Sequence, residues 1–377
     1  ILLNKCEEHS HSLGYHWNPL KCAVVAPSSD TSSYSLYGTS ISRQTSFSYL
    51  GIPIGPGGHL LTNDLIQNNT NKALHTMNTM SAIGVNHKGF NQLLSTRFYT
   101  QIVRTQLEYG LAISSFSSPQ IKKIEECQTE CIRRIFGGNS RSSTKVMLHL
   151  TNLPSMKERV HRLQGKFLLR SINGPRDILL SQFLPYLRAS ASLSHWYKLS
   201  KTPLWQRCCN FHNPDRIDTR VFNTTYHELR VENLQTQRQA NNSVLLSSCR
   251  PFHGVDPTLW LPMTPVERSR VIRWRLGWLP GGVPKPCIHH PNVMFTRKHS
   301  IICLHMHRRL QMPCTVNDPI SFLLSMLPTI KTRNKQNIQR FSSWKIRWPA
   351  LYQILFELDY LHHDKTPPQK LPLLVTS

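Results

Sequence analysis

Four residues in the last third of the sequence have the types and spacing of a metal site. Two residues separate Cys287 from His290, three separate His299 from Cys303, and eight lie between the pairs. Thiolate sulfur and imidazole nitrogen are the usual ligands of tetrahedral structural zinc. His299 and Cys303 are i and i+4, so they would share one face of a helix. The spacing predicts a structural zinc, with His289 as an alternative ligand to His290.

Basic residues supply the second chemical signal. The chain contains 45 Lys and Arg against 20 Asp and Glu, a formal net charge of +25 at pH 7. A compact body with this charge repels itself, and nucleic acid is the polyanion that most commonly neutralises such a surface. An anionic membrane surface is the alternative, although no run of 18 apolar residues occurs that could span a bilayer. We therefore expect RNA and DNA as partners and no membrane.

The ten cysteines and the start of the sequence bear on the compartment. Apart from Cys208 and Cys209, the cysteines are scattered, and no secretory signal peptide is visible. This pattern is typical of reduced thiols in an intracellular protein, nuclear or cytoplasmic, and not of a secreted disulfide framework. The oligomeric state cannot be read from the sequence.

The elements that would position these residues are mainly helices. Residues 1–13 predict the end of an amphipathic helix, and short β segments around 24–25, 34–41 and 46–54 predict a small antiparallel β element. Helices are then expected over 62–83 and over 90–113, between Ser118 and Gly138, and from Pro154 onward. The outer faces of these helices are basic, and Glu108 is expected to pair with a nearby arginine. The predicted fold class is mainly α with an N-terminal antiparallel β element.

The second half is less regular. Residues 174–262 predict an irregular linker, in which Trp196, Tyr197 and Trp205 would either stack on bases or fill a small core. Residues 266–279 predict a short basic helix before the metal segment. After the metal segment, two helices are expected, one from Asp318 and one near 348–361.

Several of these segments resemble reverse transcriptases of non-LTR (LINE-type) retrotransposons. The run CEEHSHSLGYHWNPLKC followed by SFSYLGIPI looks like the segment after the catalytic loop, whose Tyr-Leu-Gly hairpin grips the primer. RFYTQIVRTQLEYGLAI and IEECQTECIRRIFGG resemble the helices of the thumb, which packs on the template–primer. The metal segment looks like the family's C-terminal zinc knuckle, although His290 stands where the family usually has Cys.

The resemblance implies five parts: the end of the palm (1–60), a helical thumb (61–173), the linker (174–262), a zinc-knuckle-like module (263–315), and C-terminal helices with a tail (316–377). Together with the basic helix faces, it predicts that nucleic acid contacts Lys21, Tyr49, Leu50, Gly51, Arg97, Arg104, Arg133, Arg134, Arg159, Arg162, Lys166, Arg273 and Arg275.

The sequence lacks the paired carboxylates of a polymerase active site. Polymerase chemistry needs carboxylates that hold two metal ions, and no Asp-Asp dipeptide occurs in the sequence. We expect the family's Asp pair and its Mg²⁺ to lie before Ile1, so the chain alone would not polymerise. The sequence therefore predicts a fragment of an RNA-directed DNA polymerase that retains template–primer-binding parts. The alternatives are a stand-alone zinc-dependent nucleic-acid-binding protein and a non-functional relic of a transposable element.

Overall fold

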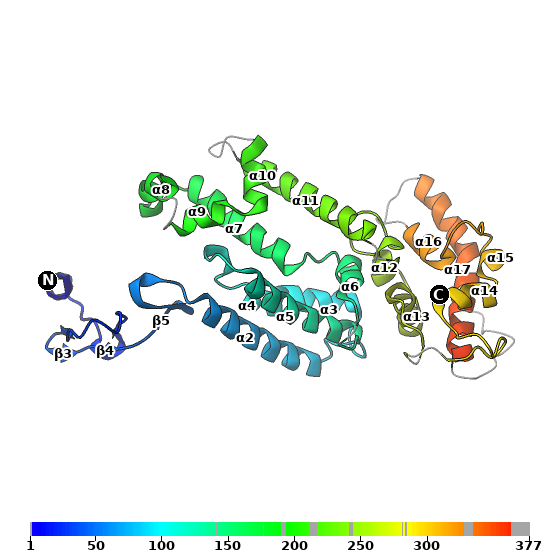
Figure 1. Ribbon diagram of the computed structural model, residues 1–377, viewed down its shortest axis with the longest axis horizontal. Coiled ribbons are helices and arrows are strands. Elements are labelled where there is room, and N and C mark those ends of the chain that lie inside the picture. The colour runs from blue at the N-terminus through cyan, green and yellow to red at the C-terminus, as the bar shows by residue number, and fades with distance from the viewer. Residues whose placement is uncertain are drawn as a thin grey trace. The chain divides into compact units, whose positions relative to one another are not determined.

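The structure is a computed structural model, and it is mainly helical (Figure 1). It describes residues 2–140, 142–175, 177–189, 194–211, 217–240, 244–280, 282, 285–327 and 335–362. None of the helices in these ranges is long and apolar enough to cross a membrane. The chain divides into two compact units. Unit 1 comprises residues 1–76, 102–127 and 160–217, and unit 2 comprises 77–101, 128–159 and 218–377.

The N-terminal part of unit 1 holds the β structure. Helix α1 (Leu2–Ser12) is followed by a short 3-10 turn (Pro19–Lys21), which Asn18 caps, and by six short strands. The strands form pairs: β2 (Ser35–Leu36) with β3 (Thr39–Ser40), β5 (Phe47–Tyr49) with β6 (Ile52–Ile54), and β1 (Ala23–Val24) with β4 (Ser42–Arg43). The first two pairs are antiparallel, as expected, whereas β1 and β4 are parallel. Two-residue strands have too little side-chain pattern for the sequence to fix their direction.

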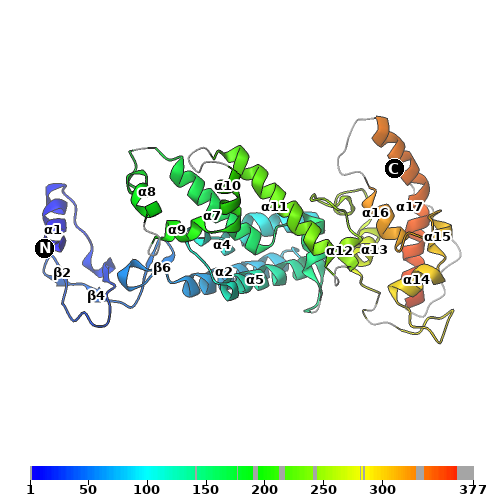
Figure 2. The ribbon, with the colours of Figure 1, turned by 45° about the horizontal axis from the view of Figure 1, so that its top comes forward.

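Three helical segments lie side by side in both views (Figures 1 and 2). They are α2 (Thr62–Ala82), the segment from α3 (Gln92–Phe98) to α4 (Arg104–Leu107), and α5 (Ser118–Phe136). A π-helical stretch, Tyr99–Val103, joins α3 to α4. The predicted helix over 90–113 is therefore shorter, because Gly110 adopts a left-handed conformation and a 3-10 turn (Leu111–Ile113) follows it. The helix predicted between Ser118 and Gly138 is confirmed as α5, and the left-handed Gly137 follows its last residue, Phe136.

The prediction of an irregular linker between the thumb and the metal segment is wrong, because this part of the chain is largely helical. Residues 174–262 contain α8 (Leu179–Ala189), α9 (His195–Ser200), α10 (Pro203–Phe211), α11 (Thr219–Gln239) and α12 (Val244–Ser247). Helix α11 buries only a narrow stripe that includes Phe222, Tyr226 and Leu234, so its sequence looks polar. Asp218 caps the start of this helix, and its side chain accepts a hydrogen bond from the Val221 amide at 2.7 Å. Trp196 and Trp205 are buried, which confirms the core alternative for these two residues.

Helices α6 (Thr144–Thr151) and α7 (Met156–Ile172) follow α5 along the chain, and α6 buries a histidine. Burial lowers the pKa of His149 from 6.5 to about 4, although the charge of Asp256 opposes the shift. The folded protein therefore holds this imidazole neutral, whereas the unfolded chain protonates it below pH 6.5. Its contribution to stability is complete above pH 6.5 and disappears as the pH falls toward 4.

We expect this linkage to remove about 3 kcal/mol of stability between pH 7 and pH 4. Urea unfolding of unit 2 should report it, with His149→Gln as the comparison, because glutamine does not titrate. The variant should lose about 3 kcal/mol less than the parent over this range. Equal losses in both proteins would show that another group governs the acid sensitivity.

The C-terminal part of unit 2 has one hydrophobic core. It joins α13 (Pro265–Leu276), α14 (Arg297–Cys303), α15 (Met306–Arg309), α16 (Pro319–Ser325) and α17 (Lys335–His362), which lie together in both views (Figures 1 and 2). The segments 263–315 and 316–377, predicted as separate parts, thus share buried residues that include Val271, Trp274, Cys287, Phe295, Ile301, Met306, Ile320, Leu351 and Ile354. Arg309 and Glu357 reinforce this packing with a bidentate ion pair at 2.5 and 2.9 Å.

Candidate metal centre and basic surfaces

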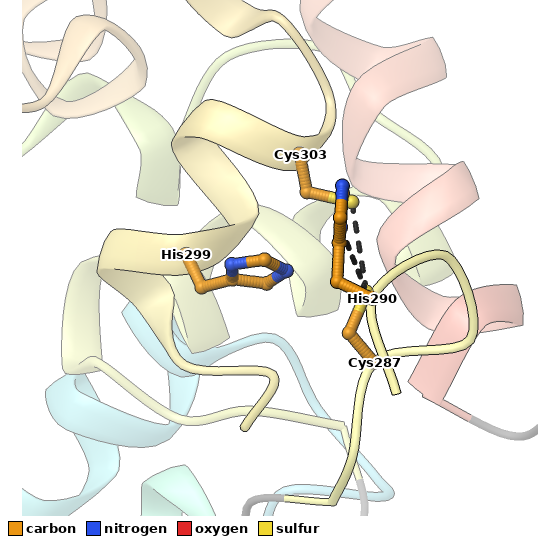
Figure 3. A group of neighbouring side chains, drawn as sticks. All are labelled: Cys287, His290, His299 and Cys303. Carbon is orange, nitrogen blue, oxygen red and sulfur yellow. Dashed lines mark hydrogen bonds between the residues drawn. The ribbon is translucent and has the colours of Figure 1, made fainter. Parts of the chain in front are cut away.

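A short hairpin positions the first two candidate ligands. An antiparallel bridge pairs Pro286 with Met294, and the Cys287 amide donates to the Val293 carbonyl at 2.9 Å. The His290 amide then donates to the Cys287 carbonyl at 3.1 Å, which closes a turn. This turn brings the Cys287 and His290 side chains to the same side of the hairpin (Figure 3).

Helix α14 positions the other two. Thr296 caps it, accepting a hydrogen bond from the His299 amide at 3.2 Å. His299 and Cys303 lie one turn apart and point toward the hairpin (Figure 3). The predicted placement of these two residues on one helical face is therefore confirmed.

The four side chains converge closely. The Cys287 and Cys303 sulfurs are 3.7 Å apart, and the Cys287 sulfur lies 3.8 Å from Nδ1 of His290. One ligand atom from each of the four residues lies within 4.8 Å of all the others, so the group can bind a metal ion. His290 belongs to this group and its neighbour His289 does not.

The surroundings shift the protonation of two of these ligands. Burial raises the pKa of the Cys303 thiol to about 12, and the hydrogen bond and charge of Cys287 add to the shift. Burial, followed by the nearby His290, lowers the pKa of His299, and this direction favours the neutral ring that can donate a lone pair. The Nε2 atom of His299 is buried and has no hydrogen-bond partner in the described structure. A metal ion would satisfy this nitrogen and stabilise both thiolates.

The predicted nucleic-acid contacts fall in both units and differ in exposure. Lys21, Tyr49, Leu50, Gly51 and Arg97 are exposed. Arg104 forms the expected ion pair with Glu108 at 3.3 Å. The partly buried members are Arg104, Arg133, Arg134, Arg159, Arg162, Lys166 and Arg273.

The predicted nucleic-acid contact at Arg275 is wrong. Its side chain is 1% exposed, and its guanidinium donates to the Ser248 carbonyl at 3.3 Å and lies 3.5 Å from the Asp256 carboxylate. A phosphate cannot reach it in this fold. The sequence placed it on a basic helix, but only the tertiary structure shows that this position faces inward.

Asp256 is a structurally important residue that the sequence analysis did not select. It is 1% exposed and lies 3.7 Å from Arg250 as well as 3.5 Å from Arg275. It also caps a 3-10 turn (Pro257–Leu259), accepting from the Thr258 amide at 2.9 Å. An Asp-Pro dipeptide is typical of such a cap, but nothing local in the sequence marks the two buried arginines that face the carboxylate.

Other carboxylates in this unit also face arginines. Asp359 pairs with Arg270 and Arg273, and Asp318 pairs with Arg297. In the described ranges, the Cys287 group is the one cluster of His, Cys, Asp or Glu suited to a metal. These acidic residues therefore stabilise the fold and do not form a carboxylate metal site.

Comparisons with protein-family models, curated proteins and solved structures found no match to this chain.

Proposed function

We propose that this chain is the template–primer-binding part of a non-LTR retrotransposon reverse transcriptase, and that a structural zinc stabilises its C-terminal region. RNA and DNA are its ligands. The paired carboxylates needed for polymerisation are not among the described residues, so the activity proposed for the chain itself is binding.

The observation that carries this proposal is the meeting of two motifs that lie far apart in sequence. The Tyr109 hydroxyl donates to the Leu50 carbonyl at 2.5 Å, which connects the Leu-Glu-Tyr-Gly motif to the Tyr-Leu-Gly turn. The Asn69 side chain in α2 donates to the Tyr109 carbonyl at 2.7 Å, and this second hydrogen bond helps to fix the position of Tyr109.

The turn itself is shaped to touch a ligand. Tyr49 and Leu50 are 61% and 72% exposed, although both are large and apolar. Leu50 and Gly51 have φ values of +49° and +77°, which make a tight hairpin turn between β5 and β6. An exposed aromatic side chain at the tip supports contact with a nucleic-acid strand, since bases stack on such side chains.

The metal group supports zinc in particular. Ideal Zn–S bonds of about 2.3 Å in a tetrahedron separate two sulfurs by about 3.8 Å. The observed separation of the Cys287 and Cys303 sulfurs is 3.7 Å. Two sulfur and two nitrogen donors suit zinc better than the oxygen-binding ions Mg²⁺ and Ca²⁺.

Binding should be electrostatic and should depend on the hairpin tip. If the chain neutralises roughly five phosphates, the logarithm of its association constant falls by about 4.5 for each tenfold rise in salt. Tyr49→Ala should weaken binding to a labelled RNA–DNA primer–template by about fivefold or more, because a stacked side chain is lost. Fluorescence anisotropy across a salt series measures both effects.

Tyr186→Ala is the matched control, because Tyr186 in α8 is 71% exposed and lies outside the two motifs. It should leave the affinity unchanged. Equal affinities for the Tyr49 and Tyr186 variants, with binding intact, would favour the second candidate, a stand-alone zinc-dependent nucleic-acid-binding protein. The metal group is the observation that supports that candidate. Absence of salt-dependent binding would contradict both.

A further inference from the structure

An open groove of about 410 Å³ lies within unit 2, and no residue of the metal group lines it. Its walls come from the loop between α2 and α3, from the end of α5, and from α13 with the residues that flank it. Residues that line the groove include Lys88, Phe90, Phe136, Arg268, Ser269, Arg273 and Trp278. Pockets that hold organic ligands usually span about 300–1,000 Å³, so the groove is large enough for one nucleotide.

Hydrogen bonds among its own residues hold the loop wall. The Lys88 and Gly89 amides donate to the Asn86 side-chain oxygen at 2.8 and 2.9 Å, and the Phe90 amide donates to the Gly84 carbonyl at 2.7 Å. A Cβ on Gly89 would lie 2.3 Å from that carbonyl oxygen, so only glycine fits there. The backbone that carries Lys88 and Phe90 is therefore held in place by these contacts.

The helical wall is equally well defined. Thr264 and Glu267 form a reciprocal capping box at the start of α13. At its other end the Trp278 amide donates to the Arg273 carbonyl at 2.9 Å, beyond the left-handed Gly277. The capping box occupies the Thr264 and Glu267 amides, so the formal charges that would attract an anion to the groove are those of side chains.

The lining combines positive charge with aromatic surface. Lys88, Arg268 and Arg273 contribute cations, and none of the lining residues is acidic. The Arg268 guanidinium is anchored on the Thr258 and Leu261 carbonyls, and Arg273 shares the Asp359 carboxylate with Arg270. Lys88 is exposed, and Phe90 and Trp278 are partly exposed. This combination is the one that single-stranded nucleic acid requires: cations for phosphates and rings for bases.

We infer that the groove binds an unpaired nucleotide of a single-stranded RNA or DNA segment. The inference rests on the proposed nucleic-acid-binding function and adds a place and a strand preference. A paired base within a duplex cannot enter the groove, because its faces and edges are already covered. The groove therefore favours single strands over duplexes.

Blocking the groove tests this directly. Ser269 lies on an exposed part of α13 that lines the groove, and tryptophan has nearly the same helix propensity as serine. In the full-length chain, Ser269→Trp should weaken binding to a short labelled oligouridylate by between fivefold and 150-fold, the range for loss of one stacked base. Its affinity for a duplex of the same length should stay the same. Val266→Trp is the matched control, because Val266 is exposed on the same helix but does not line the groove.

A charge variant separates the groove from general electrostatics. Lys88→Glu in the loop and Lys72→Glu in α2 change the same charge at two exposed positions. Lys88→Glu should reduce single-strand affinity at least fivefold more than Lys72→Glu does. Photocrosslinking with a 4-thiouridine strand should label peptides that contain residues 87–92 or 263–278.

The outcomes distinguish failure of the groove assignment from failure of the proposed function. If Ser269→Trp and Val266→Trp bind single strands equally well, and crosslinks fall elsewhere, the groove assignment is wrong while the proposed function stands. If the parent chain binds neither strand nor duplex, the proposed function fails and the groove assignment fails with it.

Discussion

Cys287→Ser should abolish stoichiometric zinc binding and lower the free energy of unfolding of unit 2 by about 4 kcal/mol. This value is the stabilisation expected from a metal held at about a thousandfold above its dissociation constant. Cys287 is 2% exposed and belongs both to the metal group and to the core beneath it. The metal would join the hairpin to α14, so its loss should loosen both elements together. Metal analysis by mass spectrometry and urea unfolding, followed by tryptophan fluorescence, measure the two effects.

Cys314→Ser provides the control for this experiment. Cys314 is exposed and lies outside the metal group, so its variant should keep both zinc and stability. Chelation of zinc from the parent chain should reproduce the Cys287→Ser unfolding curve. A parent chain that purifies without zinc and gains no stability when zinc is added would contradict the assignment of this metal.

Asp256→Asn should destabilise unit 2 by about 3–5 kcal/mol, the usual effect of removing one partner from a buried ion pair. The carboxylate lies between Arg250 and Arg275, which are only 2% and 1% exposed, so water can solvate neither guanidinium well. Asparagine keeps the shape of the side chain and is also a good helix cap, so the contact with Thr258 can persist. The variant therefore isolates the missing charge. Urea unfolding in the presence of zinc gives the measurement.

The exposed pair between Lys122 and Glu126 supplies the comparison. Its atoms are 3.9 Å apart and both side chains are well exposed, so Glu126→Gln should change stability by less than about 1 kcal/mol. An equally small change in the free energy of unfolding for Asp256→Asn and Glu126→Gln would contradict the prediction. It would show that contacts with backbone carbonyls are enough to stabilise the charges of the two buried arginines.

Local patterns predicted well what depends on neighbouring residues. The Cys287 group was predicted because its ligands come from one hairpin and one helix, whose spacing sets their geometry. The end of α5 before Gly137 and the pairing of Arg104 with Glu108 were also predictable, because each depends on residues that are close together in the sequence. Resemblance to a known family selected the Tyr49 turn, and the bond from Tyr109 places this turn beside the second motif.

Features that depend on distant residues were missed. Arg275 looked like one more cation on a basic helix, because its partner Asp256 lies elsewhere in the sequence and the Ser321 carbonyl further still. Helix α11 was overlooked because it buries few apolar side chains. The groove between the 87–92 loop and α13 joins segments about 180 positions apart along the chain, and no sequence pattern marks it.

Two contacts in this region close loops of different length. The metal group closes a loop between Cys287 and Cys303, called here the metal loop, and the ion pair of Arg270 with Asp359 closes a longer loop between α13 and α17. Cys287 and Cys303 are 16 positions apart, whereas Arg270 and Asp359 are 89 apart. Since loop-closure entropy grows with the logarithm of length, the shorter loop forms at about 1.5 kcal/mol less entropic cost. Assembly of this region consequently favours an order in which the metal loop closes first and α17 docks last. The metal loop then offers a preformed surface on which the final helix completes the core.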